Sequence, residues 1–283
     1  MSLGGSVMKI VRVVFAVVLI FVLFAPSALA GTGDYEHKIV NYVALGDSIA
    51  SGYGLDDVRS ESYVGRIAKM LEERYGAVHL VNFGRNGLRS EQLLDILVNE
   101  KNEQYGEYRT ELQKADLITL SIGSNDLLQY LSLDTNLEDF KKHGDQVFTK
   151  ACERFAQNIP RIIDAIHKQA PGAQLFVNNI YNPCNDSSFA IAEKYIDNLD
   201  IMAETYIQKM NEGFASEEVR SVFSSGTGND RYTLIDVKKA FEKTDEKLIN
   251  MVFSWRNVDP HPNKEGHRVI AEEIIANISL EKG

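Results

Sequence analysis

The sequence predicts a three-layer α/β/α fold, in which helices cover both faces of a central, mostly parallel five-stranded sheet. Five apolar segments of strand length alternate along the chain with longer segments whose apolar residues recur at helical spacing. One of them, residues 116–122, is apolar throughout its middle, which is typical of a strand buried on both faces. Strands joined by helices take right-handed crossovers, so these strands are expected to lie parallel in one sheet.

The strands are predicted at residues 39–45, 78–83, 116–122, 174–179 and 232–237. The helices are predicted at residues 62–75, 105–114, 147–169, 191–214 and 264–278, with a further helix that begins at Ser90 as its N-cap. Pro160 lies inside the long helix at 147–169, where its missing N–H group and its ring predict a kink. Residues 245–256 fit neither pattern.

The length and composition favour one main domain. The chain has 283 residues, of which 44% are hydrophobic and 25% are charged, which is enough for one large core. The formal net charge is −10, and the sequence lacks the basic stripe that is typical of nucleic-acid-binding proteins. An acidic surface also disfavours tight binding to anionic membranes. We therefore predict no nucleic-acid partner and no stable membrane partner for the mature domain.

Residues 1–30 have the pattern of a secretory signal peptide. Lys9 and Arg12 precede an apolar stretch of 18 uncharged residues that ends in small residues at Ala30. We expect cleavage after Ala30, which leaves residues 31–283 as a single domain that is secreted or displayed outside the cytoplasm. An uncleaved anchor helix is the alternative, because the uncharged stretch is nearly long enough to span a bilayer.

Two cysteines, Cys152 and Cys184, lie in the part predicted to be exported. An even number of cysteines in an oxidising compartment permits one disulfide, and two separate thiols are the alternative. Neither cysteine has a second ligand at a spacing that suits a metal, and the chain has no glycine-rich phosphate loop. We therefore predict no metal site and no cofactor.

Polar loops follow three of the predicted strands. They are Gly46-Asp47-Ser48, residues 82–87 and Gly123-Ser124-Asn125-Asp126, and a fourth polar stretch, Asp259-Pro260-His261-Pro262, precedes the last helix. The carboxyl ends of parallel strands meet at one edge of a sheet, where open α/β folds bind their ligands. These loops would bring a hydroxyl group, glycine N–H groups, a side-chain amide and an Asp/His pair to that edge. Those are the groups that acyl transfer requires.

These four motifs, in this order, resemble those of the GDSL-type esterases and lipases of the SGNH hydrolase superfamily. Ser48 matches the first motif, Gly87 the second, Asn125 the third and His261 the fourth. Each motif alone is weak, but all four in order are specific, and the resemblance covers roughly residues 39–279. The resemblance implies the flavodoxin-like fold of that superfamily and an ester-hydrolase activity without a cofactor.

The resemblance also implies a role for each matching residue. Ser48 would be the nucleophile and His261 its general base, because a serine hydroxyl needs an adjacent base and an imidazole titrates near neutral pH. The backbone N–H groups of Ser48 and Gly87 and the side-chain amide of Asn125 would form the oxyanion hole. A glycine at position 87 lets its N–H group approach the substrate with no Cβ in the way.

The acid of the predicted triad departs from the family pattern. The family's acid commonly lies three residues before the histidine, where this chain has Val258, and the nearest acid is Asp259, two residues before His261. Three alternatives follow: Asp259 orients the imidazole through a shifted local backbone, the Val258 carbonyl does so, or Asp259 only caps the turn before Pro260. We favour the first, and so predict the catalytic residues Ser48, His261 and Asp259.

Other polar residues near these motifs receive structural assignments. Asp47 is expected to hydrogen-bond locally, and Asp126 to cap a helix that begins at Leu127. His267, in the last predicted helix, is expected to pack against neighbours or face solvent. Tyr53 follows Ser48 closely in the sequence and is expected near the acyl pocket.

The sequence therefore predicts an exported serine esterase or lipase that hydrolyses carboxylic esters through an acyl-serine intermediate. Its partner is a small-molecule or lipid ester. A carbohydrate O-deacetylase, a thioesterase or a lysophospholipase would use the same residues. A non-catalytic binding protein on this fold is an alternative of another class, but a binding protein does not need Ser48, Gly87, Asn125 and His261 together.

Overall fold

The computed structural model describes residues 39–130, 137–183, 199–216, 232–250 and 259–280. The chain divides into two units, Met1–His37 and Lys38–Gly283, and all described residues belong to the second. The predicted signal peptide, Cys184 and Val258 lie outside the described residues, as do residues 191–198 of a predicted helix.

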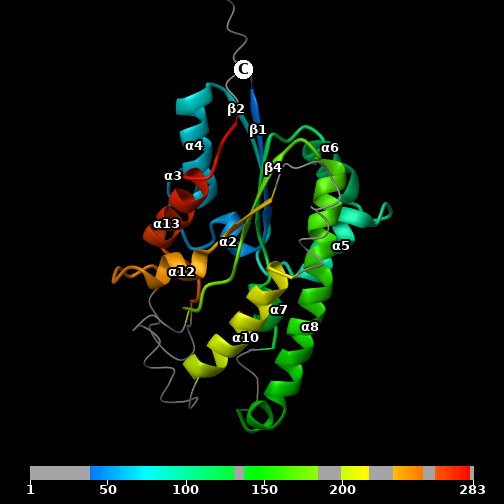
Figure 1. Ribbon diagram of the computed structural model, residues 1–283, viewed down its shortest axis with the longest axis vertical. Coiled ribbons are helices and arrows are strands. Elements are labelled where there is room, and N and C mark those ends of the chain that lie inside the picture. Colours follow the sequence, from blue (N-terminus) through cyan, green and yellow to red (C-terminus); the bar gives the residue numbers. More distant parts are fainter. Residues whose placement is uncertain (1–38, 131–136, 184–198, 217–231, 251–258, 281–283) are drawn as a thin grey trace, which may run out of the picture. The chain divides into compact units, whose positions relative to one another are not determined.

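The second unit is built on one five-stranded sheet in which every pair of neighbouring strands is parallel (Figure 1). The strands are β1 Val40–Gly46, β2 Val78–Gly84, β3 Leu117–Ser121, β4 Gln174–Asn178 and β5 Tyr232–Ile235, in the order β2-β1-β3-β4-β5. This confirms the predicted sheet and its flavodoxin-like order. The chain reverses its direction of travel across the sheet between β1 and β3, which is where such folds bind their ligands.

Ten helices of the described part separate or follow these strands. They are α2 Ser48–Ser51, α3 Val58–Glu61, α4 Tyr63–Tyr75, α5 Ser90–Val98, α6 Tyr105–Leu112, α7 Ser124–Leu128, α8 Leu137–Gln169, α10 Leu199–Phe214, α12 Val237–Glu242 and α13 Lys264–Ile275. The strands and the long helices lie where their apolar spacing predicts them. The long helix α8 begins well before residue 147 and continues through Pro160. The short helices α2, α3 and α12 are elements that the sequence pattern did not predict.

Alternating side chains of the strands build two hydrophobic cores, one on each face of the sheet. Val43 and Leu45 of β1 join the core formed with α5, α6, α8 and α10, whereas Tyr42 and Ala44 join the core formed with α2, α4, α12 and α13. Figure 1 shows these two groups of helices on opposite sides of the strands. Successive residues of a strand point to opposite faces, so a strand such as β1, buried on both, is apolar at nearly every position.

Two capping assignments made from the sequence were wrong. The N-cap of α5 is Arg89 rather than Ser90, which is the first helical residue, and Asp126 lies inside α7 rather than before it. Instead, the N–H group and hydroxyl of Ser90 both donate to the Asp126 carboxylate, at 2.9 and 2.5 Å. The two residues that were predicted as separate caps therefore satisfy each other across 36 positions of the chain.

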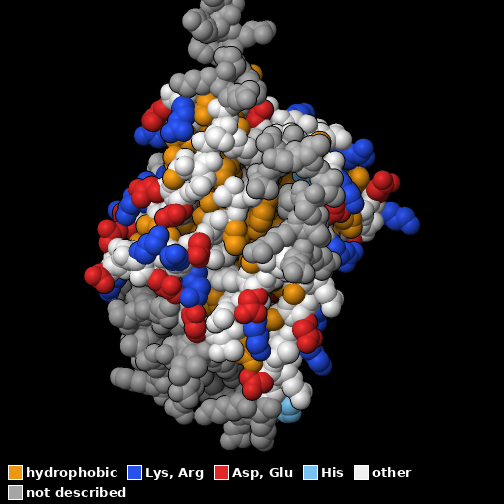
Figure 2. All heavy atoms as spheres, in the orientation of Figure 1, with side chains coloured by type: hydrophobic (Ala, Val, Ile, Leu, Met, Phe, Trp, Pro, Cys, Tyr) orange, Lys and Arg blue, Asp and Glu red, His pale blue; other side chains and the backbone are white. Residues whose placement is uncertain are grey.

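The surface of this unit is charged and mixed in sign. Figure 2 shows Lys and Arg side chains interspersed with Asp and Glu side chains over the visible face. Among the described residues, the large apolar side chains that are strongly exposed are Ile39, Tyr53, Val58, Leu80 and Val98. In the described ranges, no helix combines the length and the apolar character that crossing a membrane requires.

Candidate active site

Ser48 lies at the carboxyl end of β1, as the first residue of the short helix α2. The strand ends at Gly46, whose φ of +141° and close approach to β3 both require glycine: a Cβ there would lie 2.0 Å from the Ser121 carbonyl oxygen. Asp47 then caps α2, because its Oδ1 accepts the Ile49 N–H at 3.0 Å. Ser48 is thereby held at the sheet edge, 8% exposed.

A continuous line of hydrogen bonds joins Ser48, His261 and Asp259. The Ser48 Oγ lies 2.8 Å from the His261 Nε2, and the His261 Nδ1 lies 2.5 Å from the Asp259 Oδ1. The structure thus brings Ser48 to an acid–base pair whose histidine is 213 positions further along the chain. A hydroxyl, an imidazole and a carboxylate in this order can pass a proton from the hydroxyl to the ring while the carboxylate holds the ring in place.

The two-residue spacing of the acid is accommodated by a turn of the backbone. The Asp259 Oδ1 accepts both the backbone N–H of His261, at 3.0 Å, and the ring Nδ1 of the same residue. An aspartate that bonds the N–H two residues onward forms an Asx turn, and this turn brings the carboxylate level with the imidazole. Of the three alternatives for orienting His261, this geometry supports Asp259; Val258 lies outside the described residues.

Asp259 is suited to remain ionised beside the imidazole. Burial works to raise its pKa, but the hydrogen bonds from the His261 ring and backbone, the charge of His261 and the amide of Asn250 together hold the pKa of Asp259 below its usual value. A carboxylate that stays charged can fix the imidazole by its Nδ1 and stabilise the imidazolium that forms during the reaction.

Asp47 is in a different electrostatic environment from Asp259. It is 1% exposed, and its Oδ2 has no hydrogen-bond partner among the described residues. Burial raises the pKa of Asp47 to about 7, against the lowering effect of the Ile49 N–H and the nearby His261. Its capping contact bears out the local, structural role predicted for it.

The loops after β1, β2 and β3 are tied to one another at the same edge. The Ser51 Oγ donates to the Asn86 Oδ1 at 2.6 Å, which links α2 to the loop after β2. The Asn125 Nδ2 donates to the Leu88 carbonyl at 3.2 Å, which links that loop to α7. An amide nitrogen carries two hydrogens, so this bond leaves Asn125 a second donor.

Gly87 lies in the middle of this loop with a φ of +77°, in the left-handed region that favours glycine. A Cβ built on Gly87 would meet no atom within 4 Å, so the space around its backbone is open. Gly87 in the loop after β2 and Asn125 in α7 therefore lie at the same edge of the sheet as Ser48, and each carries an N–H donor suited to an oxyanion.

Three residues contact the turn that carries His261, and the sequence motifs assign a role to none of them. The Asn250 Nδ2 donates to the Asp259 Oδ2 at 3.0 Å, and the buried Tyr181 hydroxyl donates to the Pro260 carbonyl at 2.5 Å. The Tyr53 ring, which was expected near the acyl pocket, packs 4.7 Å from the His261 ring. Asn250 lies in a segment without periodicity and Tyr181 in an irregular one, so only the three-dimensional contacts reveal them.

His267 and Cys152 are both buried away from the line of hydrogen bonds that joins Ser48, His261 and Asp259. His267 is fully buried in α13, where its Nδ1 accepts the Tyr63 N–H at 3.2 Å, and burial lowers its pKa to about 3. Cys152 is a free, buried thiol that donates to the Tyr206 carbonyl at 3.6 Å. Within the described ranges, no group of three or more His, Cys, Asp or Glu side chains is arranged to hold a metal ion.

Solved structures that resemble this chain share its fold. A lipase from a goat rumen metagenome matches with a TM-score of 0.57 and 23% identity, covering 84% of this chain and 96% of that one. An extracellular lipase from Streptomyces rimosus matches with a TM-score of 0.58 and 19% identity, covering 84% and 100%. At these identities the likeness shows the fold alone.

Sequence comparisons identify the family. The chain is 31% identical to the spore germination lipase LipC of Bacillus licheniformis over 163 residues, which cover 56% of this chain and 70% of LipC. It is 25% identical to the uncharacterised protein YpmR of Bacillus subtilis over 254 residues, 88% of this chain and 85% of YpmR. The sequence model of the GDSL-like lipase/acylhydrolase family matches residues 44–269. The chain therefore belongs to the GDSL-like lipase/acylhydrolase family, and the prediction that it is an ester hydrolase is confirmed.

Proposed function

We propose that this chain is an exported serine esterase or lipase that hydrolyses carboxylic esters through an acyl-Ser48 intermediate. The observation that carries the proposal is the hydrogen-bonded line from Ser48 through His261 to Asp259. The similarity to LipC, a spore germination lipase, supports an ester of a carboxylic acid as substrate. The signal-peptide pattern of residues 1–30 supports export.

In the first half of the reaction, the Ser48 Oγ attacks the ester carbonyl carbon while its proton passes to the His261 Nε2. The carbonyl π electrons move to oxygen, and the oxyanion accepts hydrogen bonds from the N–H groups of Ser48 and Gly87 and from the Asn125 amide. His261 then gives its proton to the alcohol oxygen as the bond from that oxygen to the acyl carbon breaks. The alcohol leaves and an acyl-Ser48 ester remains.

In the second half, His261 removes a proton from a water molecule as the water oxygen attacks the acyl carbon. The proton returns through His261 to the Ser48 Oγ when the second tetrahedral intermediate collapses, and a carboxylic acid is released. Throughout, Asp259 fixes the ring and offsets its positive charge. The low pKa of Asp259 keeps it in the charged form that this role needs.

The first experiment measures hydrolysis of p-nitrophenyl esters from acetate to palmitate by the mature domain, with Ser48→Ala alongside. Replacing the nucleophile of a serine hydrolase lowers kcat by about 10⁶-fold, so Ser48→Ala is expected to abolish turnover. Activity that survives in Ser48→Ala would overturn the proposal. A preference for short chains would identify an esterase for small acyl groups, and one for long chains would identify a lipase.

Covalent labelling separates the proposal from its alternative of another class. A fluorophosphonate reacts with an activated serine whatever the preferred ester, so Ser48 is expected to be labelled in the wild type and not in Ser48→Ala. Labelling without ester turnover would redirect the search to thioesters and acetylated carbohydrates. A protein that neither hydrolyses esters nor takes the label would be a binding protein rather than a hydrolase.

A further inference from the structure

The Asp259 carboxylate has one oxygen committed to His261 and one that faces a different part of the chain. Its Oδ1 serves the ring and the backbone N–H of His261, and its Oδ2 accepts the side-chain amide of Asn250 at 3.0 Å. We propose that Asn250 is a positioning residue for the reaction, which fixes the Asp259 carboxylate so that this carboxylate can orient His261. The inference rests on the proposed hydrolase mechanism.

Asn250 holds both ends of the Asp259–His261 turn. Its backbone N–H donates to the His261 carbonyl at 2.9 Å, next to an antiparallel bridge between Ile249 and Pro262. Its side-chain amide reaches Asp259 nine positions along the chain. One residue therefore fixes the backbone of the base and the side chain of the acid together.

The compact spacing of the acid makes this second contact important. In an Asx turn with a partner two residues away, the carboxylate is close to its own backbone, and rotation of the carboxylate about its last bond would exchange the two oxygens. The Asp259 side chain is 34% exposed, so water competes for it. A directed N–H donor on Oδ2 opposes both the rotation and the turn of the carboxylate toward solvent.

The loop after α2 covers this contact. Gly54 has a φ of +84°, and a Cβ built there would lie 3.3 Å from the Asn250 Nδ2 and 3.8 Å from the Asp259 Oδ2. Its neighbour Tyr53 packs on the His261 ring. The backbone of Gly54 therefore lies close to the hydrogen bond between Asn250 and Asp259, which is partly buried.

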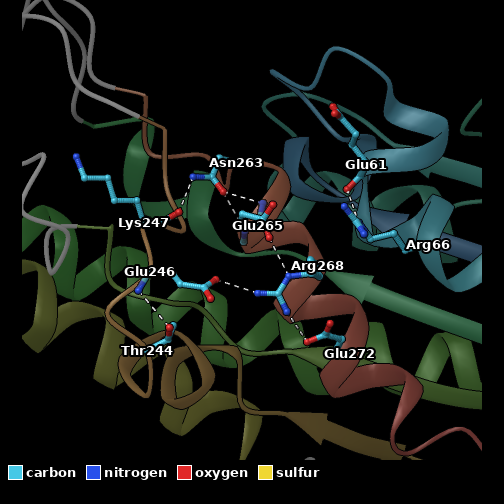
Figure 3. A network of polar contacts seen from close by, with 10 residues as sticks. Glu61, Arg66, Thr244, Glu246, Lys247, Asn263, Glu265, Arg268 and Glu272 are labelled. Carbon is cyan, nitrogen blue, oxygen red and sulfur yellow. Dashed lines mark hydrogen bonds and ion pairs between the residues drawn. The ribbon is translucent and has the colours of Figure 1, made fainter.

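The segment that carries Asn250 is anchored to the helix that follows His261. Figure 3 shows Asn263, the N-cap of α13, donating from its Nδ2 to the Lys247 carbonyl, at 2.7 Å. Further along α13, Arg268 forms an ion pair with Glu246 at 2.9 Å (Figure 3). Residues 244–250 are thus tied to α13 at two points before Asn250 meets Asp259.

Among the described residues, Asp47, His267 and Tyr181 also act electrostatically on this pair, and replacing Asn250 leaves them in the chain. Asp47 and His267 interact electrostatically with His261, and Tyr181 interacts with Asp259. Because the wild type and Asn250→Ala share these groups, a difference between their pH–rate profiles reports on the loss of the Asn250 contact.

The test compares Asn250→Ala with the isosteric Asn250→Asp in kcat and KM on one p-nitrophenyl ester. A hydrogen bond to a charged group contributes enough that Asn250→Ala is expected to lower kcat by about ten- to a hundredfold, with KM within about twofold. Asn250→Asp keeps the shape but sets two carboxylates against each other, so it is expected to lose more kcat at neutral pH than Asn250→Ala. The added negative charge is also expected to move the acid limb of its kcat/KM profile to higher pH.

Asn102 offers a matched control, because its Nδ2 donates to the Asp95 carboxylate at 2.7 Å on the exposed surface. Asn102→Asp creates the same pair of facing carboxylates away from Asp259 and is expected to leave kcat and the acid limb unchanged. An Asn250→Asp variant that keeps more activity than Asn250→Ala would contradict the inference, since shape alone would then explain the site. So would folded Asn250 variants, checked by circular dichroism, with wild-type kcat.

The failure of this inference is distinguishable from failure of the hydrolase mechanism. Fluorophosphonate labelling of Ser48 and its loss in Ser48→Ala test the mechanism without Asn250. If turnover depends on Ser48 but the Asn250 variants keep the wild-type kcat, only the positioning role of Asn250 is overturned. Absence of both labelling and turnover in the wild type would overturn the mechanism and this role with it.

Discussion

Ser48 and His261, the proposed nucleophile and base, are held in this molecule by different means. Ser48 is placed by the backbone: it follows a strand with a hydrogen-bonded neighbour on each side and begins a capped helix. His261 lies in a turn, and contacts from Asp259, Asn250 and Tyr181 hold that turn in place. The position of Ser48 should therefore tolerate the loss of a single side chain, whereas that of His261 should not.

Asp259→Asn should lower kcat more than the other changes discussed below, because it acts on the contacts that hold His261. The amide keeps the shape of the carboxylate but carries no negative charge. The His261 ring therefore loses both the carboxylate that orients it through Nδ1 and its charge partner. The equivalent change in a serine protease lowers kcat by about 10⁴-fold, and we expect a loss of about 10³- to 10⁴-fold here. Steady-state kcat on a p-nitrophenyl ester measures it, and a loss below about tenfold would show that another group orients His261.

Asn125→Ala tests the nucleophile side, where the fold should survive a lost side chain. Removing one oxyanion donor typically lowers kcat by about 10²- to 10³-fold, and KM should change little because the donor acts on charge that develops in the transition state. Asn158→Ala is the matched control: its amide donates to the Ser90 Oγ at 3.0 Å, so the variant should lose stability and keep its kcat. Equal kcat losses in both variants would point to loop disorder instead of oxyanion binding.

The same contrast explains what could be predicted from the sequence. Ser48 and Asn125 follow strands whose apolar residues are buried on both faces, and that pattern is readable without a structure. The pairing of Ser90 with Asp126 was not predicted, because capping preferences consider only residues a few positions away. Here the Asp126 carboxylate, 36 positions away, accepts the Ser90 N–H group in place of a local capping side chain.

Asp259 and its partner Asn250 show most clearly what could not be predicted from the sequence. The sequence left three alternatives for orienting His261, since Asp259 is one position from where the family pattern puts it. An Asx turn brings Asp259 to the imidazole and so supports the first alternative, and its hydrogen bond depends on backbone angles that composition does not specify. Asn250 was not a candidate, because residues 245–256 have neither the period of a helix nor that of a strand.

Tyr181→Phe should lower kcat less than Asp259→Asn or Asn125→Ala. It removes only the hydroxyl that donates to the Pro260 carbonyl, and the buried ring stays in place. A neutral hydrogen bond contributes about 0.5–1.5 kcal/mol, so kcat should fall by about three- to tenfold while the pH dependence of kcat/KM stays as in the wild type. A shifted acid limb in Tyr181→Phe would mean that Tyr181 acts on the charge of Asp259 and not on the backbone of its turn.

Asp47→Asn should have the smallest effect on turnover and a distinct effect on stability. Asparagine is as good an N-cap as aspartate, so α2 and Ser48 should keep their positions, and kcat should stay within about threefold of the wild type. The stability effect follows from the buried carboxyl, whose folded-state pKa is about 7, far above the value of about 3.9 for an unfolded aspartate.

The sign of this effect is opposite to that of a salt-bridged aspartate such as Asp259. Between about pH 4 and pH 7 the folded state holds a proton on Asp47 that the unfolded chain has released, so this group makes the protein less stable as the pH rises through that window. The amide that replaces this carboxyl in Asp47→Asn carries no charge at any pH. The free energy of unfolding of the variant, measured by urea titration, should therefore gain on the wild type by up to about 4 kcal/mol from about pH 4 to pH 7 and run parallel to it above about pH 8. A constant difference across the window would mean that water reaches Asp47 and that the framework around Ser48 is less tightly packed than the base side.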